Sequence, residues 1–284
     1  MSTQAQDPIF SQYYAAPLQL NPAFTGNTYT PHLAFNYRNE WSSFPTAYET
    51  FSASYSQFFE RVNSGFGLMI LGDDAGQGIY KTNKVGAFYS YRLEINRNLF
   101  VKMGMEASFV QYRLAWDKLQ FPDQIHPLTG FTSPGGTPIP TEETQPLNLN
   151  KSYLDFSAGM LIYSSSFYAG LSAKHLNTPN ESLLEINTNI DGGLPLRLSL
   201  HAGYEYEFRK GNKKRPSSFI SPNIMFVKQG DFGQINAGFY GNLGIVFGGL
   251  WYRQGFSNPD AAIVLFGVKK GAYKIGYSLS LIHI

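Results

Sequence analysis

The sequence predicts an all-β protein, an antiparallel transmembrane β-barrel of the bacterial outer membrane. Segments of strand length alternate between apolar and small or polar residues, as in residues 273–280. Because successive side chains of a strand point to opposite faces, each such segment has one apolar face. Charged residues are only 15% and aromatic residues 16% of the 284 residues, whereas soluble domains average about 25% charged residues. Repeated segments of this kind, separated by turn residues, are typical of membrane barrels.

The composition narrows the class further. No stretch approaches the roughly 18 consecutive apolar residues of a membrane helix, and the longest apolar runs, 68–71 and 261–266, have the length of strands. The formal net charge of +2 gives no indication of nucleic-acid binding. The lack of cysteine excludes disulfides, thiol catalysis and cysteine metal sites. Residues 1–6 have neither a basic nor an apolar region, so no complete signal peptide is visible.

The alternation places the strands in order. In one of them, Met103, Met105 and Phe109 share a face, and Lys102 and Glu106 share the other. The same pattern along the chain predicts about thirteen strands, near residues 33–37, 47–56, 64–72, 84–95, 99–109, 152–163, 166–175, 195–208, 217–228, 231–241, 244–254, 261–269 and 272–282.

The connections alternate in length. Outer-membrane barrels have short periplasmic turns and longer outer loops. With the first strand running outward, nearly every long gap falls outside; the exceptions are a short outer turn at 229–230 and a longer inner one at 209–216. The tight gaps lie near 96–98, 164–166, 241–243 and 270–271, and the longer ones near 72–80, 114–151, 176–194 and 254–260.

A soluble β-sandwich or lipocalin-like barrel is the alternative explanation of the pattern. Such folds bury one apolar face against a single core. Here the apolar face continues around some thirteen strands, and the opposite face carries Lys, Arg, Glu, Ser and Gly. A closed soluble core would bury many of these charges, whereas an apolar band against lipid explains both faces. We therefore expect a membrane barrel over residues 31–284.

Residues 1–30 are expected to form a separate N-terminal periplasmic segment or plug. Between Asp7 and residue 30 the chain has no further charge and is rich in aromatic residues. A barrel of this size leaves an aqueous path unless something fills it. A plug inside the barrel and a segment resting on its periplasmic rim both remain open. The candidate plug residues are Phe10, Tyr13, Tyr14, Asn21, Pro22 and Phe24.

No catalytic, cofactor-binding or metal-binding residues are predicted. The five histidines form no close metal-binding pair. Ser199 and His201 share a strand face, but side chains two residues apart in a strand stand roughly 6–7 Å from each other, too far for a nucleophile and its base. Asp73 and Asp74 lack the spacing of a calcium loop, so a solvated turn is favoured.

Several stretches match one known family in order. Residues 6–26, QDPIFSQYYAAPLQLNPAFTG, contain its QDP-x-(Y/F)-SQY and NPA-(Y/F)-x-G motifs, and residues 35–55 resemble its YR-x-QW segment, with Glu40 where Gln is commoner. On these motifs the chain resembles the PorP/SprF family of outer-membrane proteins in the type IX secretion system of Bacteroidetes. Further collinear matches are GFGLMILGDDAGQG at 65–78, LAWDKLQFPDQI at 114–125, FYAGLSAKHLNTPNES at 167–182, GLWYR at 249–253 and YKIGYS at 273–278.

The resemblance implies a non-enzymatic role in type IX protein secretion and gliding, in the outer membrane of a Gram-negative bacterium. The protein would help export or anchor surface proteins such as adhesins, without a cofactor. Its implied partners are outer-membrane lipid, a secreted protein with a type IX C-terminal domain, and a periplasmic or lipoprotein component of the machinery. A passive porin or small-molecule transporter is the alternative, and a barrel enzyme is a weaker third.

Two clusters are candidate partner-binding sites. Tyr37, Arg38 and Trp41 fall at the outer end of the first strand, where Tyr and Trp favour the membrane–water interface; an aromatic girdle without a binding role is the alternative. A basic run on a predicted periplasmic turn suits an acidic partner, or is simply solvated. It consists of Arg209, Lys210, Lys213, Lys214 and Arg215.

The odd strand count predicts one further strand. Single-chain bacterial barrels normally have an even number of strands. The family resembled here usually reads GYSYD near its end, followed by a linker and a final strand, whereas Leu279 follows Ser278 in this chain. The alternation also breaks at residues 282–284. We therefore expect a fourteenth strand, after residue 284, in the complete protein.

Overall fold

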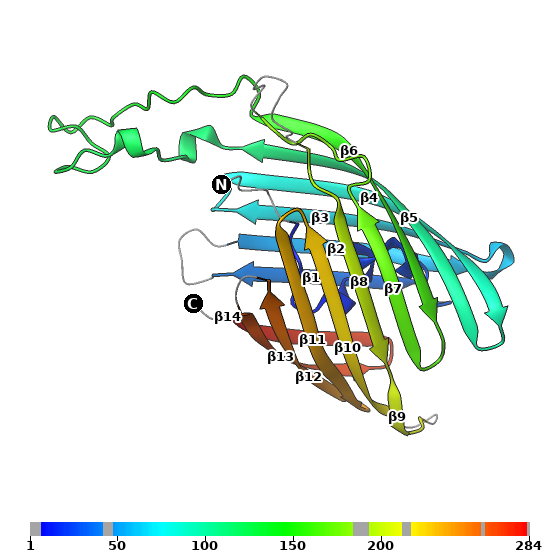
Figure 1. Cartoon of the computed structure of the whole chain (residues 1–284). Helices are drawn as coiled ribbons and strands as arrows, with labels where there is room; N and C mark the ends of the chain where they lie inside the picture. Colours follow the sequence, from blue (N-terminus) through cyan, green and yellow to red (C-terminus); the bar gives the residue numbers. More distant parts are fainter. Residues whose placement is uncertain (1–6, 42–47, 184–192, 212–216, 257–258, 283–284) are drawn as a thin grey trace.

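The computed structural model describes residues 7–41, 48–183, 193–211, 217–256 and 259–282, which form one antiparallel sheet that curves around the N-terminal residues (Figure 1). None of the described helices is long and apolar enough to cross a membrane. The strands are β1 (His32–Glu40), β2 (Tyr48–Phe59), β3 (Ser64–Ala75), β4 (Tyr80–Asn96), β5 (Leu99–Leu114), β6 (Asn150–Tyr163), β7 (Phe167–Lys174), β8 (Arg197–Tyr204), β9 (Tyr206–Arg209), β10 (Ser218–Gln229), β11 (Phe232–Leu243), β12 (Val246–Gly255), β13 (Pro259–Lys270) and β14 (Tyr273–Ile282). The helical turns are η1 (Tyr13–Ala15), α1 (Pro17–Leu20), η2 (Pro22–Phe24), η3 (Glu60–Val62), η4 (Trp116–Lys118) and η5 (Pro122–Gln124).

Each strand pairs with its neighbour in sequence, with one local exception. β8 and β9 both pair with β10, so together they occupy the single strand position predicted over 195–208. The break falls at Glu205, whose backbone N–H donates to the Ser166 carbonyl at 2.6 Å. The described residues therefore form fourteen labelled strands in thirteen side-by-side positions, which agrees with the predicted strand count.

The two ends of the sheet differ in their connections. The long-loop end carries segment 115–149 and the described residues 175–183 and 193–196, and the short-turn end carries turns at 97–98 and 271–272. Segment 115–149 extends well beyond the sheet (green in Figure 1). This asymmetry follows the predicted pattern of inner turns and outer loops.

Two predicted long gaps are shorter than expected. β3 and β4 stay paired as far as Ala75 and Tyr80, helped by an ion pair at 3.0 Å between Asp74 and Lys81, so only residues 76–79 connect them. β12 and β13 likewise stay paired through Gln254, which leaves residues 256–258 between them. Polar residues near strand ends resemble loops in the sequence, because they break the apolar pattern without breaking the hydrogen-bonded pairing.

The alternation of the two faces is confirmed. On β5, Met103, Met105 and Phe109 are exposed, while Lys102 and Glu106 are buried on the inner face. Each of the fourteen strands exposes at least one large apolar side chain on the outer face. A continuous outer apolar band of this kind is stable against lipid rather than water.

The sheet is open along one seam. Within the described residues, no hydrogen-bonded pairing joins β1 to β14. Because β1 and β14 occupy the first and the thirteenth position of an antiparallel sheet, they run in the same direction. A fourteenth strand position beyond residue 284 stays a prediction.

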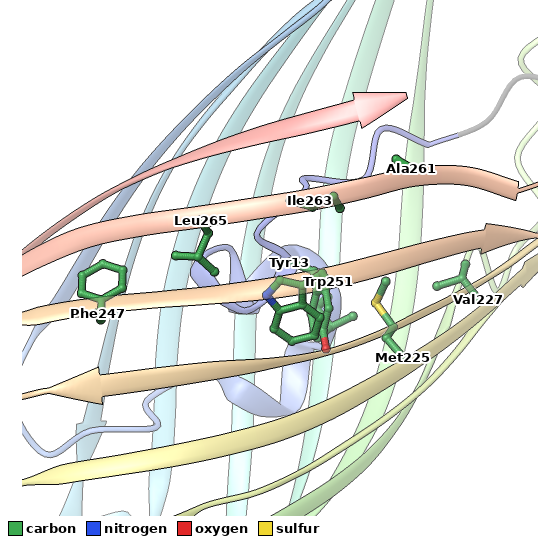
Figure 2. Packing of buried hydrophobic residues seen from close by; sticks show 9 residues of the cluster. Tyr13, Met225, Val227, Phe247, Trp251, Ala261, Ile263 and Leu265 are labelled. Carbon is green, nitrogen blue, oxygen red and sulfur yellow. The ribbon is translucent and has the colours of Figure 1, made fainter. Parts of the chain in front are cut away.

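Part of the inner face is apolar, contrary to the expectation of small and polar residues there. Met225, Trp251 and Ile263 point inward from β10, β12 and β13 and are buried (Figure 2). Tyr13 and Leu20 belong to the same cluster, and the Tyr13 ring meets Trp251 edge-on at 5.3 Å. These side chains are apolar because another part of the chain, and not water, covers them. The cluster is completed by Val227, Phe247, Ala261 and Leu265.

Candidate functional site

Residues 7–26, called the inner segment, lie inside the curve of the sheet (Figure 1). Pro17 and Pro22 stand at the first positions of α1 and η2, where a missing N–H costs no hydrogen bond. Asn21 caps η2, because its Oδ1 accepts the Ala23 N–H at 2.8 Å. The buried residues of the segment are Phe10, Tyr13, Ala16, Leu18, Gln19, Leu20, Asn21, Pro22, Ala23, Thr25 and Gly26.

Asn21 ties the inner segment to three adjacent strands. Its amide nitrogen lies 3.1 Å from the carbonyl oxygens of Met160 and Leu171 and from Nε2 of His201. These partners belong to β6, β7 and β8. Gly159 of β6 makes the approach possible, since any Cβ there would overlap the Asn21 side chain.

Backbone carbonyls of the inner segment accept hydrogen bonds from side chains of the sheet. The Thr25 carbonyl accepts from Ser90 Oγ at 2.7 Å and from Lys102 Nζ at 2.6 Å. Lys102 also donates to the Gly26 carbonyl at 3.0 Å. The amine therefore satisfies two backbone carbonyls at the end of the segment. Two similar contacts are Ser172 Oγ to Leu20 O at 2.8 Å and Asn36 Nδ2 to Ala15 O at 3.2 Å.

Asp7 joins the inner segment to a cluster of buried charges. Its Oδ2 lies 2.9 Å from His175 Nε2 and 3.0 Å from Arg197 Nη1. His175 follows β7 directly, Arg197 begins β8, and each side chain is 4% exposed. His175 Nδ1 in turn lies 3.1 Å from Asp155 Oδ1. The remaining pairs are Lys84–Glu106 at 2.7 Å, Lys84–Asp155 at 3.5 Å and Lys174–Glu106 at 3.6 Å.

A comparison with protein families decides where this fold belongs. The model described as type IX secretion system membrane protein PorP/SprF matches residues 2–282. The chain belongs to the PorP/SprF family. No curated protein matches it. Membership confirms the resemblance read from the motifs and, with the all-β sheet, the outer-membrane β-barrel class.

In this PorP/SprF protein, Asp7 and His175 hold each other in the charged state. Burial alone would raise the pKa of Asp7, but His175, Arg197 and Lys84 lower it well below its usual 3.8. Burial alone would lower the pKa of His175, but the carboxylates of Asp7 and Asp155 raise it from 6.5 to about 9. Both groups are therefore charged at neutral pH.

The Asp7–His175 contact is expected to weaken in alkali. The contribution of His175 is complete below pH 6.5 and is lost as the pH rises through about 9. Asp7 contributes above pH 3.8 and loses its contribution only in acid. The thermal unfolding midpoint of the wild type should fall as the pH is raised from neutral to above 9. The fall should be smaller in His175→Gln, and equal falls in the two proteins would contradict this. The other charged groups facing the pair are Lys84, Glu106, Asp155, Lys174, Glu181 and Arg197.

The candidate plug residues all belong to the inner segment or its turns. Phe10, Tyr13, Asn21 and Pro22 are buried, and Tyr14 and Phe24 are half-buried. Tyr14 stacks on Trp251 at 5.8 Å, and Phe24 stacks on His201 at 5.3 Å. These contacts are those of a segment packed on the inner face, and a plugging role stays a prediction.

The first partner-binding cluster lies at the long-loop end but does not form one surface. Tyr37 points outward and is 66% exposed, whereas Arg38 points to the inner face and pairs with Glu40 at 2.7 Å. Trp41 is exposed and meets Tyr48 edge-on at 5.4 Å. Adjacent strand residues point to opposite faces, so Tyr37 and Arg38 cannot share a contact surface.

The described part of the basic run, Arg209 and Lys210, lies at the short-turn end. Arg209 ends β9 and is exposed, as is Lys210. Lys213, Lys214 and Arg215 lie outside the described residues.

His201, Asp73 and Asp74 each contact another side chain of the protein. Ser199 and His201 are buried on the inner face, where His201 contacts Asn21. Asp73 accepts from Thr50 Oγ1 at 2.5 Å, and Asp74 pairs with Lys81. Across the described ranges, no group of three or more His, Asp or Glu side chains is arranged to hold a metal ion.

The sequence reasoning missed the partners of Asp7. His175 and Arg197 lie 168 and 190 residues away in the chain. The only local signal was that Asp7 is the single charge before a long uncharged stretch. A lone charge in an otherwise buried segment requires a partner, because burying an unpaired charge is costly.

Proposed function

We propose that this chain is a non-enzymatic outer-membrane component that helps export or anchor surface proteins such as adhesins in a bacterium of the Bacteroidetes. It would bind a cargo with a type IX C-terminal domain at its extracellular end and a periplasmic or lipoprotein component at its periplasmic end. Family membership supports the secretion role. Segment 115–149, which extends beyond the sheet, supports an outer contact (Figure 1).

The observation that carries the choice against a porin is the inner segment. Its aromatic and aliphatic side chains pack on β10, β12 and β13, and its single charge is paired. A water-filled pore would instead be lined by solvated polar groups. We propose that the segment acts as a plug, and that the barrel anchors and guides other proteins without conducting solutes.

Two surfaces are proposed for partners. Arg38 and Trp41, with Tyr37 at the lipid boundary, would contribute to cargo contact at the long-loop end. Arg209 and Lys210, continued by the basic residues 213–215, would dock an acidic periplasmic partner.

Deleting the gene is expected to abolish surface display of the cognate adhesin and to impair gliding, while re-expression of the intact chain restores both. The purified full chain should show no steady ohmic conductance in planar bilayers. Normal display in the deletion strain would contradict the secretion role. A steady conductance of the intact protein would favour the porin.

A further inference from the structure

The contact between Asp7 and the sheet has the form of an occupied binding site. His175 and Arg197 present a ring N–H and a guanidinium N–H to one carboxylate oxygen, at 2.9 and 3.0 Å. Both side chains are 4% exposed with Asp7 in place, and they lie directly after β7 and at the start of β8. Charge-assisted hydrogen bonds of this kind are the strong ones.

The other charges of the cluster are already balanced among themselves. Lys84 pairs with Glu106 and Asp155, and Lys174 pairs with Glu106. Among the described residues, Arg197 has Asp7 as its ion-pair partner. Within the described residues, loss of Asp7 would leave this buried guanidinium without a counter-charge, which is costly inside a protein. The position therefore requires an anion.

The size and charge of the position select a carboxylate. Asp155 lies 3.1 Å from the other nitrogen of His175, so a dianion such as phosphate would sit close to a second negative charge. The occupant in the structure is itself a carboxylate, that of Asp7.

The carboxylate position is partly exposed. The Asp7 side chain is 25% exposed and borders a cavity of about 100 Å³. Tyr80 and Tyr112, at the start of β4 and the end of β5, line the same cavity. The carboxylate position therefore borders a cavity that is partly lined by residues from the long-loop end of the sheet.

We propose that His175 and Arg197 form a carboxylate-binding site, occupied within the chain by Asp7, for which a carboxylate on an incoming peptide competes. The carboxylate is that of an acidic side chain or of a peptide C-terminus. Its binding would release the start of the inner segment from the sheet. The site is a property of the inner face and does not depend on the proposed secretion role.

Asp7→Ala opens the site to a small probe, sodium acetate. Acetate should raise the thermal unfolding midpoint of the full-length variant in detergent, saturably and beyond sodium chloride of equal ionic strength. The wild-type protein should show no such rise, because Asp7 fills the site. Asp123→Ala, which removes an exposed loop carboxylate, is the matched control and should behave as the wild type.

A second set of variants keeps the test decisive. The double variant Asp7→Ala, Arg197→Gln should lose the acetate effect, and Asp7→Asn serves in place of the alanine variant if that one does not fold. Equal effects of acetate and chloride on Asp7→Ala, or an acetate effect that survives Arg197→Gln, would overturn the site.

The peptide source is tested with a fluorescent peptide that contains no Asp or Glu, in C-terminal acid and amide forms. The acid should bind Asp7→Ala at least about tenfold more tightly than the wild type, because the competing group is gone. The amide form should bind Asp7→Ala no more tightly than it binds the wild type. Equal binding of acid and amide would overturn the assignment of a peptide carboxylate.

Discussion

Replacing Gly104 with valine is expected to unseat the inner segment from the sheet. Gly104 faces inward on β5, directly beneath Pro22 and Ala23. A Cβ at this position would come closer than 3.0 Å to the backbone atoms of both residues, a distance that real Cβ contacts essentially never show. Backbone atoms cannot rotate away as a side chain can, so the segment itself must move.

The expected loss of stability is about 3 kcal/mol, at the upper end of the usual cost of overpacking. Urea unfolding in lipid vesicles measures it. Chymotrypsin provides a direct reading of the segment, because Phe10, Tyr13 and Tyr14 are buried or half-buried and should resist cleavage in the wild type. In Gly104→Val, cleavage after these residues should become fast, and bilayer conductance should appear if the segment is a plug.

Gly241→Val is the matched control. Gly241 is also a strand glycine, on β11, but its nearest non-adjacent atom would be 3.8 Å from an added Cβ. Valine suits strands, so this variant should keep wild-type stability and protease resistance. Wild-type behaviour of Gly104→Val would mean that the segment does not pack against β5 as described.

The strands could be predicted from the sequence because a membrane barrel imposes a simple physical rule. Lipid outside and a partly polar interior force residues such as Met105 and Glu106 onto opposite faces of one strand. The rule acts on each strand independently, so local alternation suffices. It fails near strand ends such as Asp74 and Lys81, where pairing continues among polar residues.

The inner face could not be predicted in the same way, because its contacts join distant parts of the chain. Residues 261–266 are apolar throughout, and no alternation shows that Ile263 and Leu265 point inward. They are buried because residues of the cluster around Tyr13 cover them. The choice between a buried segment and one on the rim depends on this tertiary packing.

The candidate sites show the same division. The aromatic content of the inner segment marked Phe10 and Tyr13 as candidates, and both are buried. Tyr37 and Arg38 were grouped by sequence proximity, although strand geometry separates them onto two faces. The partners of Asp7 come from β7 and β8, and a single sequence contains no information about that pairing.

Asn21→Ala is expected to destabilise the protein by roughly 2 kcal/mol, from the two buried hydrogen bonds that the amide can donate, at about 1 kcal/mol each. The amide nitrogen lies 3.1 Å from Met160 O, Leu171 O and His201 Nε2, and Asn21 is fully buried. Its two hydrogens cannot serve all three acceptors at once, but removing the amide leaves all of them without it. The lost cap on Ala23 N–H adds to the effect.

The same unfolding measurement in vesicles tests this substitution, with Asn27→Ala as its control, because Asn27 is exposed just beyond the inner segment. The control should change the free energy of unfolding by less than about 0.5 kcal/mol, as exposed substitutions usually do. His201→Phe separates the contributions of the contacts: it removes one partner of Asn21 and keeps a ring for Phe24 to stack on. The loss of unfolding free energy in His201→Phe should be smaller than in Asn21→Ala. In the double variant the two losses should not add fully, since the two side chains share a contact. Full additivity would show that Asn21 and His201 stabilise the barrel independently, and a change within about 0.5 kcal/mol for Asn21→Ala would show that the segment is held by its apolar side chains alone.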